Sequence, residues 1–222
     1  MPKISLAVAV VALAAPALYA QPASPVGALV DRAVAAHARV TSARATFDQT
    51  ITNPLTGTTA SAKGEVVMTK SPNRFSVRFT DPAGDRIVAD GRSVWVYVPS
   101  TNPGQVVKLP MGAAGTGPDV VNDLLERTRA KFTVSDAGTA TIGGRATRAV
   151  QLVPKDPKQF TKAIVWIDTT DASVRQFELT EGTGLVRRIR LTSFERNVTV
   201  PESAFAFTPP KGVRVYDTTR EQ

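Results

Sequence analysis

The 222-residue sequence contains no cysteine and only one histidine. The missing thiol excludes disulfide bonds, thiolate metal sites, a cysteine nucleophile and the acylated cysteine that anchors a lipoprotein. A single histidine, His37, cannot build a multi-histidine metal site, and it leaves a Ser-His-Asp triad without an obvious partner. We therefore expect no metal site, and a mature protein that is free in solution.

Motifs of catalysis are missing as well. The sequence has no G-x-S-x-G elbow, H-E-x-x-H, P-loop or G-x-G-x-x-G after a strand. Asp81, Asp85 and Asp90 lie in predicted turns, where aspartate commonly caps backbone N–H groups, so they are weak candidates for an acid–base pair. We expect neither an enzyme nor a cofactor.

Acidic residues are outnumbered by basic ones, 19 against 27, which gives a formal net charge of +8. Such a surface attracts anionic partners. The densest basic run, residues 187–190, has no interleaved aromatic residues for base stacking, so we expect no nucleic-acid partner. In a strand, Arg188 and Arg190 would lie on the face opposite Arg187 and Ile189.

No apolar run reaches the roughly 20 residues that a membrane-spanning helix needs. Lys3 is followed by the apolar run Ile4–Ala15 and then by small residues at Ala17 and Ala20, a pattern typical of a secretory signal peptide. We predict cleavage after Ala20, so that residues 1–20 are the signal and residues 21–222 form one domain. Export without disulfides favours the periplasm.

Helical periodicity occurs in two short segments. Residues 25–40 place Val30 and Val34 on one apolar face, and residues 118–127 do the same with Val121, Leu124 and Leu125. Two short helices cannot bury these faces on each other alone. We expect them to cover the concave side of a sheet as a lid.

The remaining chain changes to a period of two, which is typical of strands. The predicted strands lie near 44–52, 60–70, 73–80, 85–90, 93–99, 105–109, 131–136, 145–153, 161–168, 173–180 and 184–194, with a final extended piece at 204–215. The fold is therefore predicted to be mainly β, an incomplete antiparallel barrel of about ten or eleven strands with two short helical segments as its lid.

The alternation of apolar residues predicts a cavity. Residues 75–80 alternate apolar and polar side chains, whereas residues 94–98 place valines on one face and Trp95 and Tyr97 on the other. A half-open barrel leaves room for a ligand, although ordinary core under the helices would give the same pattern. The candidate cavity residues are Phe47, Val67, Phe75, Val77, Phe79 and Val96.

Four segments, in order along the chain, carry a family resemblance. Residues 44–49 (RATFDQ) resemble a small-x-F-x-Q strand, residues 70–75 (KSPNRF) a K-R-P-N-x-F turn, residues 87–99 an I-x-x-D-G-x-x-x-W-x-Y-x-P hairpin and residues 205–215 an F-x-F-x-P-P-x-G-V end. The family is that of the periplasmic outer-membrane lipoprotein carriers, LolA. The resemblance implies a monomeric carrier that takes acylated lipoproteins from an inner-membrane exporter to an outer-membrane receptor and holds their acyl chains in the cavity.

One position departs from the family pattern. The family commonly has an arginine before the proline of the K-R-P-N turn, where it holds the lid closed, but this chain has Ser71. Ser71 and Arg74 are therefore the candidate lid-contact residues of this turn, with Arg74 or Lys70 as the substitute for the missing arginine.

Two other functions fit the same fold. One is a periplasmic regulatory protein that senses lipid or mislocalised lipoprotein, and such sensors usually carry an additional domain. The other is a lipid-modifying hydrolase, which would need a clustered Ser or Asp/Glu site that the sequence does not offer.

Overall fold

The computed structural model describes residues 25–111, 119–157 and 159–219. The predicted signal peptide and the glycine-rich stretch 112–117 lie outside these residues. Within the described ranges, no helix combines the length and the apolar character needed to cross a membrane.

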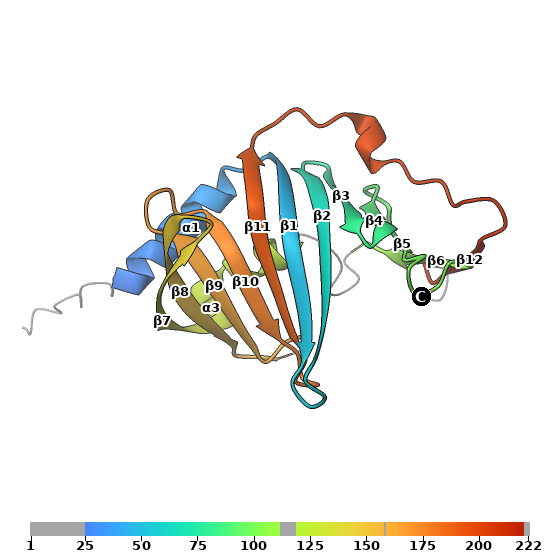
Figure 1. Ribbon diagram of the computed structural model, residues 1–222. Coiled ribbons are helices and arrows are strands. Elements are labelled where there is room, and N and C mark those ends of the chain that lie inside the picture. The colour runs from blue at the N-terminus through green and yellow to red at the C-terminus, as the bar shows by residue number, and fades with distance from the viewer. Residues whose placement is uncertain (1–24, 112–118, 158, 220–222) are drawn as a thin grey trace, which may run out of the picture.

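A single twisted sheet of 12 strands forms the body of the protein (Figure 1). Its order is β12-β6-β5-β4-β3-β2-β1-β11-β10-β9-β8-β7. The strands are β1 (Ser42–Asn53), β2 (Thr58–Lys70), β3 (Asn73–Asp81), β4 (Ala83–Ala89), β5 (Ser93–Tyr97), β6 (Gln105–Pro110), β7 (Phe132–Ile142), β8 (Arg145–Pro154), β9 (Lys162–Asp168), β10 (Val174–Thr180), β11 (Val186–Arg196) and β12 (Arg214–Asp217).

The sheet curves but does not close, since its edge strands β7 and β12 do not pair with each other in the described residues. All neighbours are antiparallel except β12, which runs parallel to β6. The predicted incomplete antiparallel barrel is confirmed, with 12 strands instead of ten or eleven. The predicted extended piece at 204–215 is mostly irregular, and its last residues form β12, which is only four residues long.

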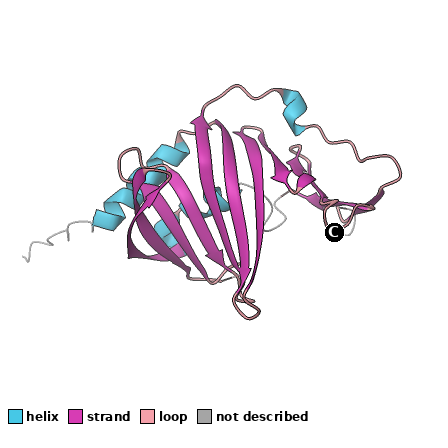
Figure 2. Ribbon diagram, in the orientation of Figure 1, coloured by secondary structure: helices cyan, strands magenta, loops and turns pink. Residues whose placement is uncertain are grey.

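The helices are short and cover one face of the sheet (Figure 2). They are α1 (Pro25–Ala38), α2 (Asp119–Leu125) and α3 (Thr128–Lys131), and a 3₁₀ turn, η1 (Glu202–Phe205), lies on the other side of the sheet. The first two were predicted. The four-residue α3 and η1 were not, because a single turn is too short to show a helical period.

Two apolar clusters lie on the concave side. The first joins α1 and α2 to strands β7 to β10 and includes Val30, Leu124, Ile167 and Phe177. The second lies on β1 to β5 around Phe75, which is only 1% exposed. Ile189 on β11 packs against both clusters.

Polar contacts hold α1 on the β7–β10 half of the sheet. Arg32 donates hydrogen bonds to the carbonyl oxygens of Thr169 and Thr170 in the β9–β10 turn. Asp31 pairs with Arg129 of α3, with Nε–Oδ1 and Nη2–Oδ2 distances of 3.0 and 2.6 Å. The first turns of the helix are therefore fixed to that half of the sheet.

The β9–β10 turn is itself organised by Asp168, whose side chain is 1% exposed. Burial alone would raise the pKa of this carboxyl group. Hydrogen bonds from Arg145 and from the backbone N–H groups of Thr170 and Asp171 outweigh burial and lower the pKa to about 2. Asp168 is thus a structural anion that shapes the platform for α1.

The C-terminal segment, residues 197–213, runs from β11 past the β3–β5 side of the sheet to β12 (Figure 1), and some of its side chains pack on the outer face. Phe207 packs against Trp95 and Tyr97 of β5, with ring centroids 5.7 and 6.3 Å apart. These two aromatics lie on the face opposite Val94, as the alternation predicted, and the C-terminal segment is what covers them.

Arg74 also belongs to this outer-face contact. Its guanidinium forms a bidentate pair with Glu202 and lies 4.6 Å from the ring centroid of Phe205. The prediction that Arg74 contacts the lid is therefore wrong. It lies one residue before Phe75 in β3, so the alternation turns it to the outer face, away from the helices.

We predict that Phe205→Ala destabilises the fold by about 3 kcal/mol, because Phe205 is 3% exposed and its loss leaves a cavity under the C-terminal segment. The measurement is urea unfolding followed by tryptophan fluorescence. Leu55→Ala is the control, since Leu55 is 85% exposed and its truncation should cost less than about 0.5 kcal/mol. Equal midpoints for the two variants would contradict the prediction.

Candidate functional site

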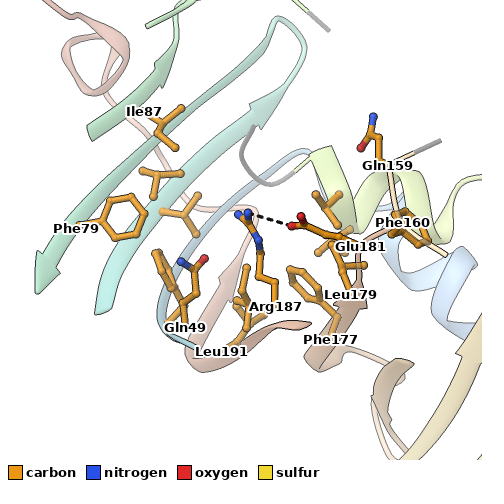
Figure 3. Close-up of a pocket in the computed structure, with 16 residues that line it drawn as sticks. Gln49, Phe79, Ile87, Gln159, Phe160, Phe177, Leu179, Glu181, Arg187 and Leu191 are labelled. Carbon is orange, nitrogen blue, oxygen red and sulfur yellow. Dashed lines mark hydrogen bonds and ion pairs between the residues drawn. The ribbon is translucent and has the colours of Figure 1, made fainter. Parts of the chain in front are cut away.

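A cavity of about 200 Å³ lies on the concave side, between the two apolar clusters (Figure 3). Both halves of the sheet contribute to it, and α2 covers it with Val120 and Val121. Its walls are Phe47, Gln49, Val66, Val77, Phe79, Ile87, Val120, Val121, Gln159, Phe160, Phe177, Leu179, Glu181, Arg187, Ile189 and Leu191. Twelve of these sixteen side chains are apolar, so the cavity suits a hydrocarbon group.

A smaller cavity of about 90 Å³ lies next to the first, under α1. The two share Val66, Val121 and Leu191 as lining residues. Ala33, Ala36 and His37 of α1 and Leu125 of α2 form part of its wall. Small side chains on α1 therefore leave space between the helix and the sheet.

The floor of the main cavity depends on Gly64 of β2. Gly64 pairs with Phe47 of β1 on one side and with Phe79 of β3 on the other. The two rings meet edge to face above it, with centroids 5.7 Å apart and an interplanar angle of 87°. A Cβ atom at Gly64 would lie 2.8 Å from Cζ of Phe47 and 2.7 Å from the carbonyl oxygen of Arg78, so only glycine allows this arrangement.

The structure divides the six predicted cavity residues: three line the main cavity, two pack beside it, and one lies on the opposite face of the sheet. Phe47, Val77 and Phe79 line the main cavity. Phe75 and Val96 belong to the same apolar cluster but do not line it.

Val67 lies on the opposite face of the sheet, in a groove beneath the C-terminal segment. Its placement in the cavity was wrong. Val66 and Val67 are consecutive valines, so the sequence does not say which of them points inward. Val66 is the valine that lines the cavity.

The predicted lid residues also divide. Val121 lines both cavities and Leu125 the smaller one, whereas Val30 and Leu124 are buried in the first cluster and Val34 packs against it. The sequence reasoning missed Phe177, Leu179 and Ile189 of the cavity wall. Their alternation along β10 and β11 was a usable signal, but the pairing of β11 with β1 that brings them to the cavity was not predicted.

Lys70, at the end of β2, makes the contact with the lid that Ser71 and Arg74 do not. Its Nζ donates a 2.7 Å hydrogen bond to the carbonyl oxygen of His37 in the last turn of α1. Ser71 is exposed in the following turn. Burial lowers the pKa of the Lys70 ammonium, and the Glu126 carboxylate just after α2 opposes part of that shift. A cation at this place suits the negative end of a helix dipole.

Two of the three acidic residues that the sequence singled out, Asp85 and Asp90, have capping roles. Asp85 accepts hydrogen bonds from the backbone N–H and hydroxyl of Ser100. Asp90 accepts them from Trp95 Nε1 and from the N–H groups of Arg92 and Ser93. No group of three or more His, Asp or Glu side chains that could hold a metal ion occurs among the described residues.

An open curved sheet with short helices over an apolar concave cavity is suited to a protein that binds an apolar ligand. A family model described as "Outer membrane lipoprotein carrier protein LolA" matches residues 38–208. The chain belongs to this family, which confirms the resemblance drawn from its motifs.

Individual relatives agree with the family. An outer-membrane lipoprotein carrier protein of Methylibium petroleiphilum is 30% identical over 181 residues, covering 80% of this chain and 84% of the relative. The carrier protein of Leptothrix cholodnii is also 30% identical and covers 79% of each chain. A solved structure, an uncharacterized conserved protein from Thermus thermophilus, superposes with a TM-score of 0.54 at 15% identity, covering 86% of this chain and 97% of that one, and supports the fold alone.

We predict that Gly64→Ala destabilises the protein by about 1–3 kcal/mol, the usual cost of overpacking, and displaces the Phe47 ring into the cavity. Urea unfolding measures the first effect, and weaker binding of an environment-sensitive apolar dye measures the second. Gly104→Ala is the control, because the nearest atom to its added Cβ is 3.9 Å away. Unchanged dye binding in Gly64→Ala would show that Phe47 does not shape the cavity.

Proposed function

We propose that the protein is a periplasmic carrier that binds the acyl chains of lipoproteins and moves them from the inner to the outer membrane. The observation that carries the proposal is the apolar cavity between both halves of the sheet and the helices, in a chain of the lipoprotein-carrier family. Its partners would be acylated lipoproteins as cargo, an inner-membrane exporter and an outer-membrane receptor.

The physical need for such a carrier follows from hydrocarbon solubility. Each acyl CH₂ group exposed to water costs about 0.8 kcal/mol, so an acylated protein cannot cross an aqueous compartment unaided. The signal-like N-terminus supports export, and the absence of cysteine means that this chain cannot itself be acylated as a lipoprotein.

The main cavity is small for an acyl chain. Small-molecule pockets usually measure roughly 300–1,000 Å³, whereas the main cavity here is about 200 Å³. Acyl chains would therefore need the helices to move away from the sheet. A ligand stabilises such an open form only through contacts that the closed form lacks.

A matched pair of substitutions on β2 tests the proposal. Val66→Glu places a carboxylate in the cavity wall and should abolish cargo binding, whereas Val67→Glu places it on the outer face and should not. Each protein is mixed with a triacylated lipoprotein in detergent, the detergent is removed, and co-elution is measured by size exclusion. Circular dichroism verifies that both variants fold.

If the unmodified protein does not keep the lipoprotein in solution, the proposed carrier function is wrong. Equal losses in both variants would mean that the cavity is not the binding site.

A second prediction concerns Lys70. Lys70→Met removes the donor to the His37 carbonyl and should weaken closure of the lid, so an apolar fluorescent probe should enter several-fold faster in stopped-flow measurements. Lys63→Met, an exposed position on the same strand, is the control for lost charge. Identical entry rates in the two variants would remove Lys70 from the closing mechanism.

A further inference from the structure

The mainly apolar cavity wall contains four polar side chains: Gln159 lies beside Phe160, and the other three, Gln49, Glu181 and Arg187, follow the strands. Along β10 the cavity side chains change from Phe177 and Leu179 to Glu181, just beyond the strand. Along β11, read in the opposite direction, they change from Leu191 and Ile189 to Arg187. Because β10 and β11 are antiparallel, with Leu179 opposite Arg187, both polar residues lie at the same end (Figure 3).

The neighbouring strand β1 also changes from an apolar to a polar side chain in the direction of Arg187. Phe47 of β1 is opposite Leu191, and Gln49 is opposite Ile189, one step nearer to Arg187. The cavity therefore combines a mainly hydrocarbon wall with a polar patch, a combination that suits an amphiphile.

Arg187 is only loosely engaged. Its Nη2 lies 3.4 Å from Oε1 of Glu181, and the two side chains are 35% and 30% exposed. A guanidinium carries five N–H donors. This is its one ion pair or side-chain hydrogen bond with the described residues, so most of these donors face the cavity or solvent.

The other face of the same hairpin provides a comparison. Arg188 donates two hydrogen bonds to Glu178, at 2.9 and 2.7 Å, and this pair lies on the outer side of the sheet. The outer pair, Arg188–Glu178, has short hydrogen bonds and joins β11 to β10. The cavity pair, Arg187–Glu181, joins β11 to the turn after β10 and is longer.

We propose that Arg187 and Glu181 select the lipid that enters the cavity: Arg187 donates to the ester carbonyls of a diacylglyceryl group, and Glu181 excludes anionic phospholipid. This inference rests on the proposed carrier function. The lipid end of a lipoprotein carries glyceryl esters without a phosphate, whereas membrane phospholipids carry both. A carrier loaded at a membrane meets phospholipid in large excess.

The selection follows from charge. Arg187 alone would attract a phosphate at least as strongly as an ester, because hydrogen bonds between ions exceed those to neutral acceptors. Glu181 cancels the net charge at this end of the cavity while leaving the spare N–H donors in place. Ester carbonyls keep their hydrogen bonds, and a phosphate gains no net attraction.

The experiment compares two probes with identical acyl chains, a fluorescent diacylglycerol and the corresponding phosphatidic acid, each delivered from cyclodextrin to the full mature chain. Glu181→Gln should tighten phosphatidic acid binding by about tenfold while leaving diacylglycerol binding within about twofold. Glu178→Gln removes the same charge from the outer face of the hairpin and should change neither probe.

The reciprocal substitution guards against a folding artefact. Arg187→Gln leaves Glu181 without its cation and should weaken both probes, phosphatidic acid the more. An unchanged ratio of the two affinities in Glu181→Gln, or an equal change in Glu178→Gln, would overturn the selection while leaving a carrier that binds both lipids. Binding of neither probe by the unmodified protein would overturn the carrier function as well.

Discussion

The antiparallel pairing of β1 with β11 is the interaction on which the rest of the structure depends. It joins strands about 140 residues apart in sequence, with Phe47 opposite Leu191 and Gln49 opposite Ile189. Without it the chain would be two separate curved sheets, each with its own apolar cluster. With it, the clusters face each other across the concave side, and the space between them becomes the cavity.

Among the described residues, the helices fill only part of this space. Side chains of α1 and α2 complete the cluster on β7 to β10, while the concave face of β1 to β5 receives little cover from them. An incompletely filled cavity gives up dispersion contacts along its walls. Hydrocarbon from a ligand can supply the missing contacts, which makes loading favourable without very tight retention.

The sequence predicted the elements well and the long-range arrangement less well. Alternation placed Phe47, Val77 and Phe79 on the cavity face and Arg188 and Arg190 on the outer face, because a period of two is unambiguous when polar and apolar residues alternate. The consecutive valines at 66 and 67 do not show by their alternation which of the two faces the cavity. The partners of Arg74 and Lys70 depended on where the C-terminal segment and α1 lie in space, which local periodicity does not encode.

The polar contacts of α1 hold the helix to both halves of the sheet. Arg32 and Asp31 bind the helix to the β9–β10 turn and to α3, on one side of the cavity. Lys70 binds its last turn to β2, on the other side, through a hydrogen bond from Nζ to the carbonyl oxygen of His37. Only residues 39–41 separate α1 from β1, and Thr41 accepts a hydrogen bond from the N–H of Lys70 and donates one to Oδ1 of Asn197, so the chain itself keeps the end of α1 beside β1 and β2.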